Sequence, residues 1–174
     1  MKRVKLTLWA FTPKASCGLS KIFSYLVCFW TRSKWDHIGF STDEKYFEAT
    51  PFVGVRSYPT TRRDAVFIHS WDVITTPEKE QWLEDQLGKP YDIWGVLGFV
   101  IGPSKDGRID RGHWFCSEIA AARLAQFGIK PCGDIPVWEI SPKMLVTEVL
   151  KRFDKTYCSV LTSIRNKLSW LYHQ

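Results

Sequence analysis

The sequence lacks the features that mark several common classes of protein. It has no C-x-x-C pair and no histidines paired at metal-ligand spacing. Its cysteines are odd in number and widely separated: Cys17, Cys28, Cys116, Cys132 and Cys158. This pattern supports neither a zinc site nor a disulfide framework, so we expect reduced thiols, no metal and no cofactor.

Long apolar runs, repeats and low-complexity segments are also absent. The basic start of the chain leads into a short apolar stretch that Thr12-Pro13-Lys14 interrupts, whereas a signal peptide needs about 7–15 apolar residues. The apolar run at residues 22–30 is shorter than the roughly 20 apolar residues that are needed to span a bilayer. We expect one domain over residues 1–174, without a signal peptide or transmembrane segment and cytoplasmic by default, with delivery to a cell wall left open.

The charge balance is basic but is not concentrated in one motif. The formal net charge is +6, which suits an anionic partner such as a cell-wall polymer, nucleic acid or a lipid surface. Solubility explains dispersed lysines and arginines equally well. Because no arginine cluster is interleaved with aromatic residues, a nucleic-acid-binding module is the least favoured class. Peripheral contact with lipid stays open, and the sequence does not predict the oligomeric state.

Hydrophobic patterns predict an α+β fold, with a small antiparallel sheet packed with helices. Strands are expected at residues 3–10 and 65–73, and a hairpin at 37–50 with its turn at 42–45. Helices are expected at 18–31, from Thr76 to Gly88, after Cys116, from a Ser141 cap, and as a basic amphipathic helix within 155–174. Residues 104–112 are expected to form a polar loop.

Residues 112–128, GHWFCSEIAAARLAQFG, place a cysteine where a helix is expected to begin. Apolar residues after Cys116 recur near helical spacing, and Gly128 and Pro131 provide a stop. Unpaired N–H groups and the positive end of the helix dipole favour a thiolate in a first turn, which prepares a nucleophile. The alternative interpretation is a small buried hydrophobic residue, the commoner fate of an intracellular cysteine.

A nucleophilic cysteine needs a base, and the candidates are His37, His69, His113 and His173. His37 begins a predicted strand, and we expect the nearby Gly39 to leave room for a neighbouring backbone. If the hairpin turns at 42–45, the strand of Glu48 lies beside that of His37, so its carboxylate can orient the imidazole. The alternatives are a hydrogen-bonded structural histidine and a solvated strand charge.

Four segments together resemble a known family. They are SKWDHIGFST (33–42), YFEATPFVGVRSYP (46–59), LGKPYDIWGVLGF (87–99) and HWFCSEIAAARLAQFGIKP (113–131). In these segments and their order the chain resembles the circularly permuted NlpC-type papain-like cysteine hydrolases, the branch of YiiX-like proteins and relatives of lecithin:retinol acyltransferase. The resemblance covers about residues 3–150, and the histidine strand precedes the cysteine helix, which is the permuted order.

The resemblance implies a permuted papain-like fold and a role for four residues. Cys116 matches the nucleophile, His37 the general base, and Glu48 the residue that orients the histidine. Tyr91 matches a tyrosine beside the nucleophile whose hydroxyl, with the backbone N–H of Cys116, binds the developing oxyanion. Many relatives carry Asp-Cys-Ser where this chain has Phe115-Cys116-Ser117, so the flank of the nucleophile is more apolar here.

The two residues after Cys116 are expected to serve the helix. We expect Ser117 to satisfy backbone donors of the first turn, and Glu118 to be a charge at the helix start.

The function implied first by the resemblance is hydrolysis of an amide bond through an acyl-enzyme, by a peptidase or amidase acting on peptidoglycan-type peptides. The alternative at the same site is a thioesterase, lipid hydrolase or acyltransferase. That alternative requires an apolar channel, and the candidates to line it are the aromatic residues Phe40, Phe52, Trp71, Trp94 and Phe99.

Overall fold

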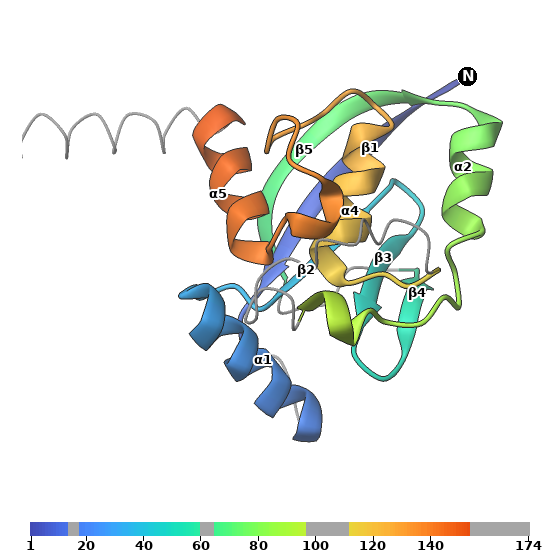
Figure 1. Cartoon of the computed structure of the whole chain (residues 1–174). Helices are drawn as coiled ribbons and strands as arrows, with labels where there is room; N and C mark the ends of the chain where they lie inside the picture. Colours follow the sequence, from blue (N-terminus) through green and yellow to red (C-terminus); the bar gives the residue numbers. More distant parts are fainter. Residues whose placement is uncertain (14–17, 60–64, 97–111, 154–174) are drawn as a thin grey trace, which may run out of the picture.

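The computed structural model describes residues 1–13, 18–59, 65–96 and 112–153, and its centre is a five-stranded antiparallel sheet (Figure 1). The strands are β1 (Lys2–Phe11), β2 (His37–Ser41), β3 (Tyr46–Thr50), β4 (Gly54–Tyr58) and β5 (Val66–Thr75). They are ordered β4-β3-β2-β1-β5 across the sheet. The predicted α+β class with a small antiparallel sheet is therefore confirmed.

The hairpin formed by β2 and β3 has the predicted turn. The Thr42 N–H donates to the Lys45 carbonyl at 2.9 Å, and Gly39 lies opposite Glu48 in the register. Strand β4, by contrast, was not among the strands predicted. Its sequence, GVRSY, has no clear alternation of apolar and polar residues, and it is held in the sheet by pairing with β3 along its whole length.

Helices cover the sheet and extend from it. They are α1 (Gly18–Thr31), α2 (Pro77–Glu84), α4 (Cys116–Ala125) and α5 (Pro142–Phe153), with a short 3-10 turn, η2 (Val137–Glu139). Helix α4 packs on β2 and β3, whereas α5 packs on β5. Figure 1 shows α4 in front of the sheet and α1 projecting below it. The core forms where β1 and β2 meet α4 and α5, with Leu8, Ile38, Ile119 and Leu145 among its buried members.

One predicted helix end needs correction, and the predicted starts of α2 and α5 are confirmed. Helix α2 ends at Glu84 rather than near Gly88, and Leu87 lies in the following turn. Thr76 precedes α2, but its side chain makes no capping hydrogen bond. The predicted cap of α5 is present, because the Ser141 hydroxyl accepts the Met144 N–H at 3.2 Å.

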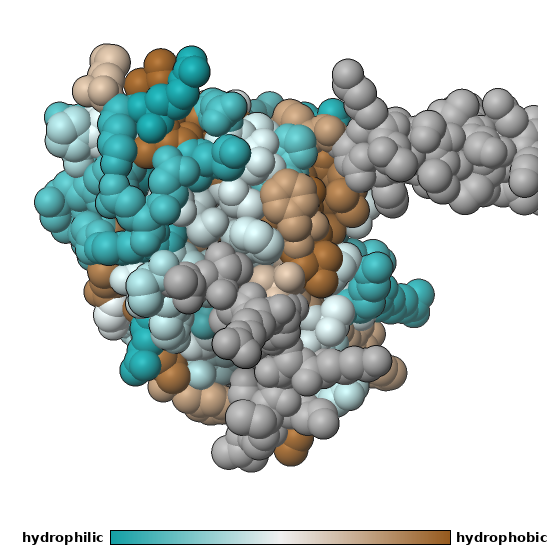
Figure 2. Space-filling view, turned by 180° about the vertical axis from the view of Figure 1, so that it is seen from behind, coloured by the Kyte–Doolittle hydropathy of each residue, from teal (hydrophilic) through white to brown (hydrophobic). Residues whose placement is uncertain are grey.

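The predicted helix within 155–174 and residues 104–111 of the predicted polar loop lie outside the described residues. Seen from behind, hydrophilic residues cover the corner that carries α2 (Figure 2). Within the described ranges, no helix is both long enough and apolar enough to cross a membrane.

Candidate active site

Cys116 is the first residue of α4, as the sequence predicts. Phe115 before it is extended, and the Glu118 carboxylate accepts the Phe115 N–H at 3.3 Å, which fixes the entry into the helix. Cys116 is a free cysteine and is 2% exposed. The first turn of a helix presents N–H groups without helical partners and the positive end of the dipole, and both favour negative charge on Sγ.

His37 opens β2 and is held by Glu48 of β3. The His37 Nε2–H donates to Glu48 Oε2 at 2.9 Å, and both side chains are buried. Glu48 lies opposite Gly39 in the register, and Gly39 is two residues beyond His37. Side chains two residues apart on a strand share one face of a sheet, so the pairing brings the carboxylate to the same face as the imidazole.

The imidazole of His37 contacts Cys116 as well. Burial alone lowers the pKa of His37, but hydrogen bonds with Cys116 and Glu48 and the charges of both raise it from 6.5 to about 10. Since Nε2 is held by Glu48, the second ring nitrogen, Nδ1, is left to serve the thiol. The structure thus brings together Cys116, His37 and Glu48, for which the sequence analysis predicts the roles of nucleophile, base and orienting carboxylate.

Tyr91 joins this group. Burial, the charge of Cys116 and a hydrogen bond with Cys116 raise the pKa of the Tyr91 hydroxyl well above 10, so it stays protonated and can donate. Tyr91 pairs with Trp114 in an isolated parallel bridge, in which the Asp92 N–H donates to the Trp114 carbonyl at 3.1 Å. The bridge ties the tyrosine segment to the residues that lead into Cys116.

Strand β4 anchors the other end of the tyrosine segment. The Val55 N–H donates to the Lys89 carbonyl at 2.9 Å, and the Gly88 N–H donates to the Val55 carbonyl at 3.0 Å. Gly54 has a φ of +87°, and a Cβ there would lie 2.2 Å from the Lys89 oxygen. A residue other than glycine at position 54 would therefore push away the segment that carries Tyr91.

Tyr46 is a member of the site that the sequence analysis missed. Its hydroxyl donates to Glu48 Oε2 at 2.8 Å, so this carboxylate oxygen accepts from both Tyr46 and His37. A Cβ on Gly39 would lie 2.0 Å from the Tyr46 hydroxyl. The glycine makes room for this phenol, and not for a neighbouring backbone as expected. The available signal was that Tyr46 and Glu48, two residues apart on one strand, face the same side.

Asp36 is a second missed residue and directly precedes His37. It is buried, and its Oδ1 has no hydrogen-bond partner. Only a few buried side-chain atoms in the described part of the chain lack a partner in this way. Its charge also contributes to the raised pKa of Tyr91, so the two side chains are close enough to interact. A buried carboxylate oxygen without a donor is costly, and a ligand N–H would satisfy it.

The other predicted candidates lie elsewhere. His69 on β5 packs against the rings of Trp71 and Phe153, and His113 is exposed. His173 lies outside the described residues. Neither His69 nor His113 is among the groups that perturb the pKa of His37.

The role expected for Glu118 is confirmed, and the role expected for Ser117 is wrong. The Ser117 hydroxyl donates to the Ile140 carbonyl at 2.7 Å instead of serving its own helix turn, and this bond ties α4 to the segment before α5. Glu118 does serve the helix start, but burial raises its pKa from 4.5 to about 8.

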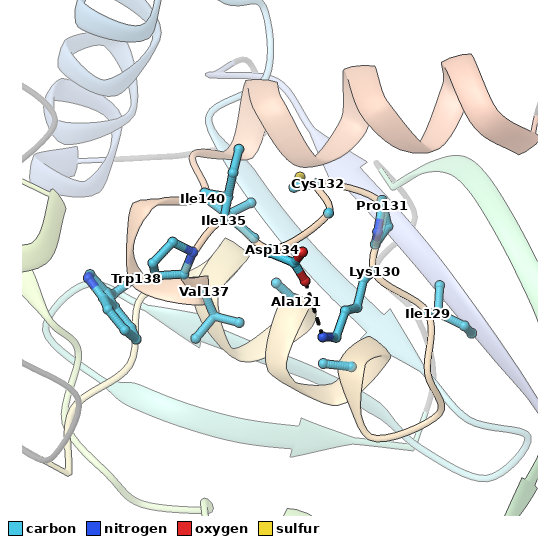
Figure 3. A pocket seen from close by; sticks show the side chains of 13 residues that line it. Ala121, Ile129, Lys130, Pro131, Cys132, Asp134, Ile135, Val137, Trp138 and Ile140 are labelled. Atoms are coloured by element: carbon cyan, nitrogen blue, oxygen red, sulfur yellow. Dashed lines mark ion pairs between the residues drawn. The ribbon is translucent and has the colours of Figure 1, made fainter.

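A pocket on another side of α4 is separate from this group. It is lined by Ala121, Ala125 and residues 129–138 with Ile140, and Figure 3 shows the Lys130–Asp134 ion pair across it, at 3.5 Å. It contains none of the four predicted site residues. It does contain Cys132, but burial raises the pKa of that thiol to about 11, so it is a poor nucleophile.

The aromatic residues proposed for a channel do not share one environment. Phe40 stacks on Phe47 in the core, and Trp71 packs beside Phe153. Phe52 and Trp94 are exposed, and Phe99 lies outside the described residues.

In the described ranges, no group of three His, Cys, Asp or Glu residues is placed to hold a metal ion. The sequence matches no protein-family model and no curated protein. The geometry of the site and the resemblance to the permuted hydrolases are therefore the two grounds for assigning a function.

Proposed function

We propose that this chain is a cysteine hydrolase with a permuted NlpC-type papain-like fold, which cleaves an amide bond through an acyl-enzyme. One observation carries the proposal. His37, at the start of a strand, contacts both the Cys116 thiol at a helix start and the buried Glu48 carboxylate. A nucleophile beside a base, with a third group orienting that base, is the arrangement that covalent catalysis requires.

The proposed reaction follows from these positions. The Cys116 thiolate attacks the carbonyl carbon, and Tyr91 with first-turn N–H groups donates to the oxygen as it becomes negative. The C–N bond breaks, and the amine leaves with the proton held by the His37 imidazolium. Water then attacks the thioester while His37 takes its proton, which releases the carboxylic acid and restores the thiolate.

The buried Asp36 carboxylate supports an amide substrate that carries N–H donors. Its Oδ1 is buried without a hydrogen-bond partner and its charge acts on Tyr91, so an ammonium or amide N–H of a bound peptide would satisfy it. A peptide of the peptidoglycan type offers such groups on both sides of its scissile bond, and a simple acyl chain does not.

The second candidate is a thioesterase, lipid hydrolase or acyltransferase that uses the same Cys116, His37 and Glu48. A separate observation favours it. Helix α1, which ends at Thr31 shortly before His37, exposes a face of large apolar side chains. Comparing kcat/KM for short peptides with that for long-chain acyl thioesters separates the two candidates.

The test of the catalytic proposal is acylation by p-nitrophenyl acetate, read by intact mass and peptide mapping. We expect one acetyl group on Cys116, and a fall in the acylation rate of about a hundredfold or more in His37→Ala. The matched controls, His69→Ala and His113→Ala, should acylate nearly as fast as the parent. If the His113 variant proved the inactive one, the proposed site would be wrong.

A further inference from the structure

Helix α1 presents an apolar face to the outside of the molecule. Its exposed large side chains are Ile22, Tyr25, Leu26, Phe29 and Trp30, which we call the α1 face. Their spacing of three and four residues places them on one side of the helix. Phe29 is 76% and Ile22 is 60% exposed, whereas Ser24 and Val27 are buried toward the body. Among the α1 side chains that the structure describes, more large apolar ones are exposed than buried, and a patch of this kind marks an interaction site.

The charged residues that flank the α1 face in the sequence are basic. Residues 12–35 contain Lys14, Lys21, Arg32 and Lys34 and neither aspartate nor glutamate. Arg32 and Lys34, which directly follow the helix, are exposed. An apolar helical face with adjacent cations is complementary to a lipid surface that carries negative head groups. Tyr25 and Trp30 also fit, because their rings favour the boundary between lipid and water.

Two further segments that expose an apolar side chain lie toward the same end of the molecule in Figure 1. In Figure 1 the turn between β3 and β4, which exposes Phe52, and residues 93–96, which expose Trp94, lie toward the lower end, as α1 does. Phe52 has a φ of 69°, a conformation that a bulky residue rarely adopts. A lipid surface can contact several separate apolar groups at one end of a protein.

We propose that the α1 face docks this protein on an anionic lipid surface, with the helix lying in the interface. A second copy of the chain is a poorer occupant, because a stable protein interface needs about 20–30 residues a side and the α1 face offers one short helix. The proposal does not depend on catalysis.

The test is co-sedimentation of the full chain with phosphatidylcholine vesicles prepared with and without phosphatidylglycerol. We expect binding that is stronger with phosphatidylglycerol and weaker in high salt. Ile22→Gln/Phe29→Gln should weaken binding about tenfold or more, and glutamine is a good helix former, so the fold is kept. Arg32→Gln/Lys34→Gln should remove mainly the dependence on phosphatidylglycerol.

Matched controls separate this face from general surface effects. Phe67→Thr/Ile74→Thr removes the same two residue types from β5, where they are 56% and 55% exposed, and should bind as the parent does. Cys116→Ala should also bind normally, so failure of the catalytic proposal leaves this one intact. The docking proposal is overturned if the parent chain does not bind vesicles, or if the β5 variant loses as much binding. It is also overturned if the α1 variant instead dissociates a lipid-free dimer in light scattering.

Discussion

At the scale of single residues, the buried Glu48 carboxylate has two separable effects on His37. Its oxygen fixes the direction of the ring by accepting the Nε2–H at 2.9 Å, and its negative charge stabilises the imidazolium. A hydrogen bond can position a ring without charge, but only charge shifts the balance between imidazole and imidazolium by a large amount. Glu48→Gln keeps an acceptor and removes the charge, so it separates the two effects.

We expect Glu48→Gln to lower the rate, though by less than the loss of Cys116 or His37. Without the carboxylate, the pKa of His37 should fall below its raised value of about 10. The upper limb of the pH–rate profile should therefore move to lower pH. The measurement is kcat/KM against pH on a substrate that Cys116→Ala cannot turn over. Rates and limbs equal to those of the parent would exclude Glu48 from the site.

Tyr46→Phe is the companion change for the same prediction. It removes a donor to Glu48 Oε2 but leaves the charge, so the rate should fall roughly tenfold, as a hydrogen bond to a charged group suggests, without a shift of the upper limb to lower pH. Tyr58→Phe is the matched control, because Tyr58 lies against Tyr46 with ring centroids 6.2 Å apart but belongs to neither the His37 nor the Glu48 hydrogen bond. A limb shift in Tyr46→Phe equal to that of Glu48→Gln would contradict a positioning role.

At the scale of elements, the start of α4 places an acid where it is hard to ionise. Burial raises the pKa of Glu118 from 4.5 to about 8, although its hydrogen bond with the Phe115 N–H works in the opposite direction. Between these two pH values the folded chain keeps a proton that the unfolded chain has lost. The stability contributed by neutral Glu118 is therefore complete below pH 4.5 and declines as the pH rises to about 8.

In Glu118→Gln the side chain does not titrate. The melting temperature of the variant relative to that of the parent should therefore rise from pH 4.5 to about 8 and then level off. The corresponding gain in the free energy of unfolding, relative to the parent, is on the order of a few kcal/mol. The raised pKa of His37 also makes stability fall at higher pH, but it does so in both proteins and cancels in the difference. A difference that stays constant over this range would contradict the prediction.

Many of the helices, strands and turns could be predicted because each is determined by a short local stretch of sequence. The turn at 42–45, the helix at 18–31 and the start of α4 each depend on patterns within a few residues. Contacts between distant segments could not be predicted in the same way. Two features depend on tertiary packing, which no local sequence pattern predicts. They are the hydrogen bond from the Ser117 hydroxyl to the Ile140 carbonyl and the packing of the Tyr46 phenol over Gly39. Strand β4 was missed for the same reason, since its pairing with β3 outweighs a weak pattern.

At the scale of the whole molecule, the site depends on segments that are far apart in the sequence. His37 and Glu48 come from one hairpin, Tyr91 from a loop tied to β4, and Cys116 from α4. The resemblance to a family supplied this grouping, because spacing within the sequence left four histidines as competing bases: His37, His69, His113 and His173. The other two described cysteines, Cys28 and Cys132, have no histidine among the groups that shift their pKa.

The reactivity of the cysteines therefore tests the molecule as a whole. Exposure alone favours Cys28, which is half-buried, over Cys132 and Cys116, which are both buried. Burial, however, raises the pKa of both Cys28 and Cys132 to about 11, so near neutral pH they are thiols and react slowly. Cys116 has the imidazole of His37 and the helix start beside it. We expect iodoacetamide to modify Cys116 first in the folded chain, as followed by peptide mapping over time.

Two controls make the labelling order decisive. In His37→Ala, labelling of Cys116 should slow while that of Cys28 stays unchanged, because the effect acts through one neighbour. In urea, all five cysteines, including Cys17 and Cys158, should react at similar rates, since the folded environment is lost. If Cys28 reacted first in the folded parent, exposure would govern reactivity and Cys116 would be the buried hydrophobic residue of the alternative interpretation.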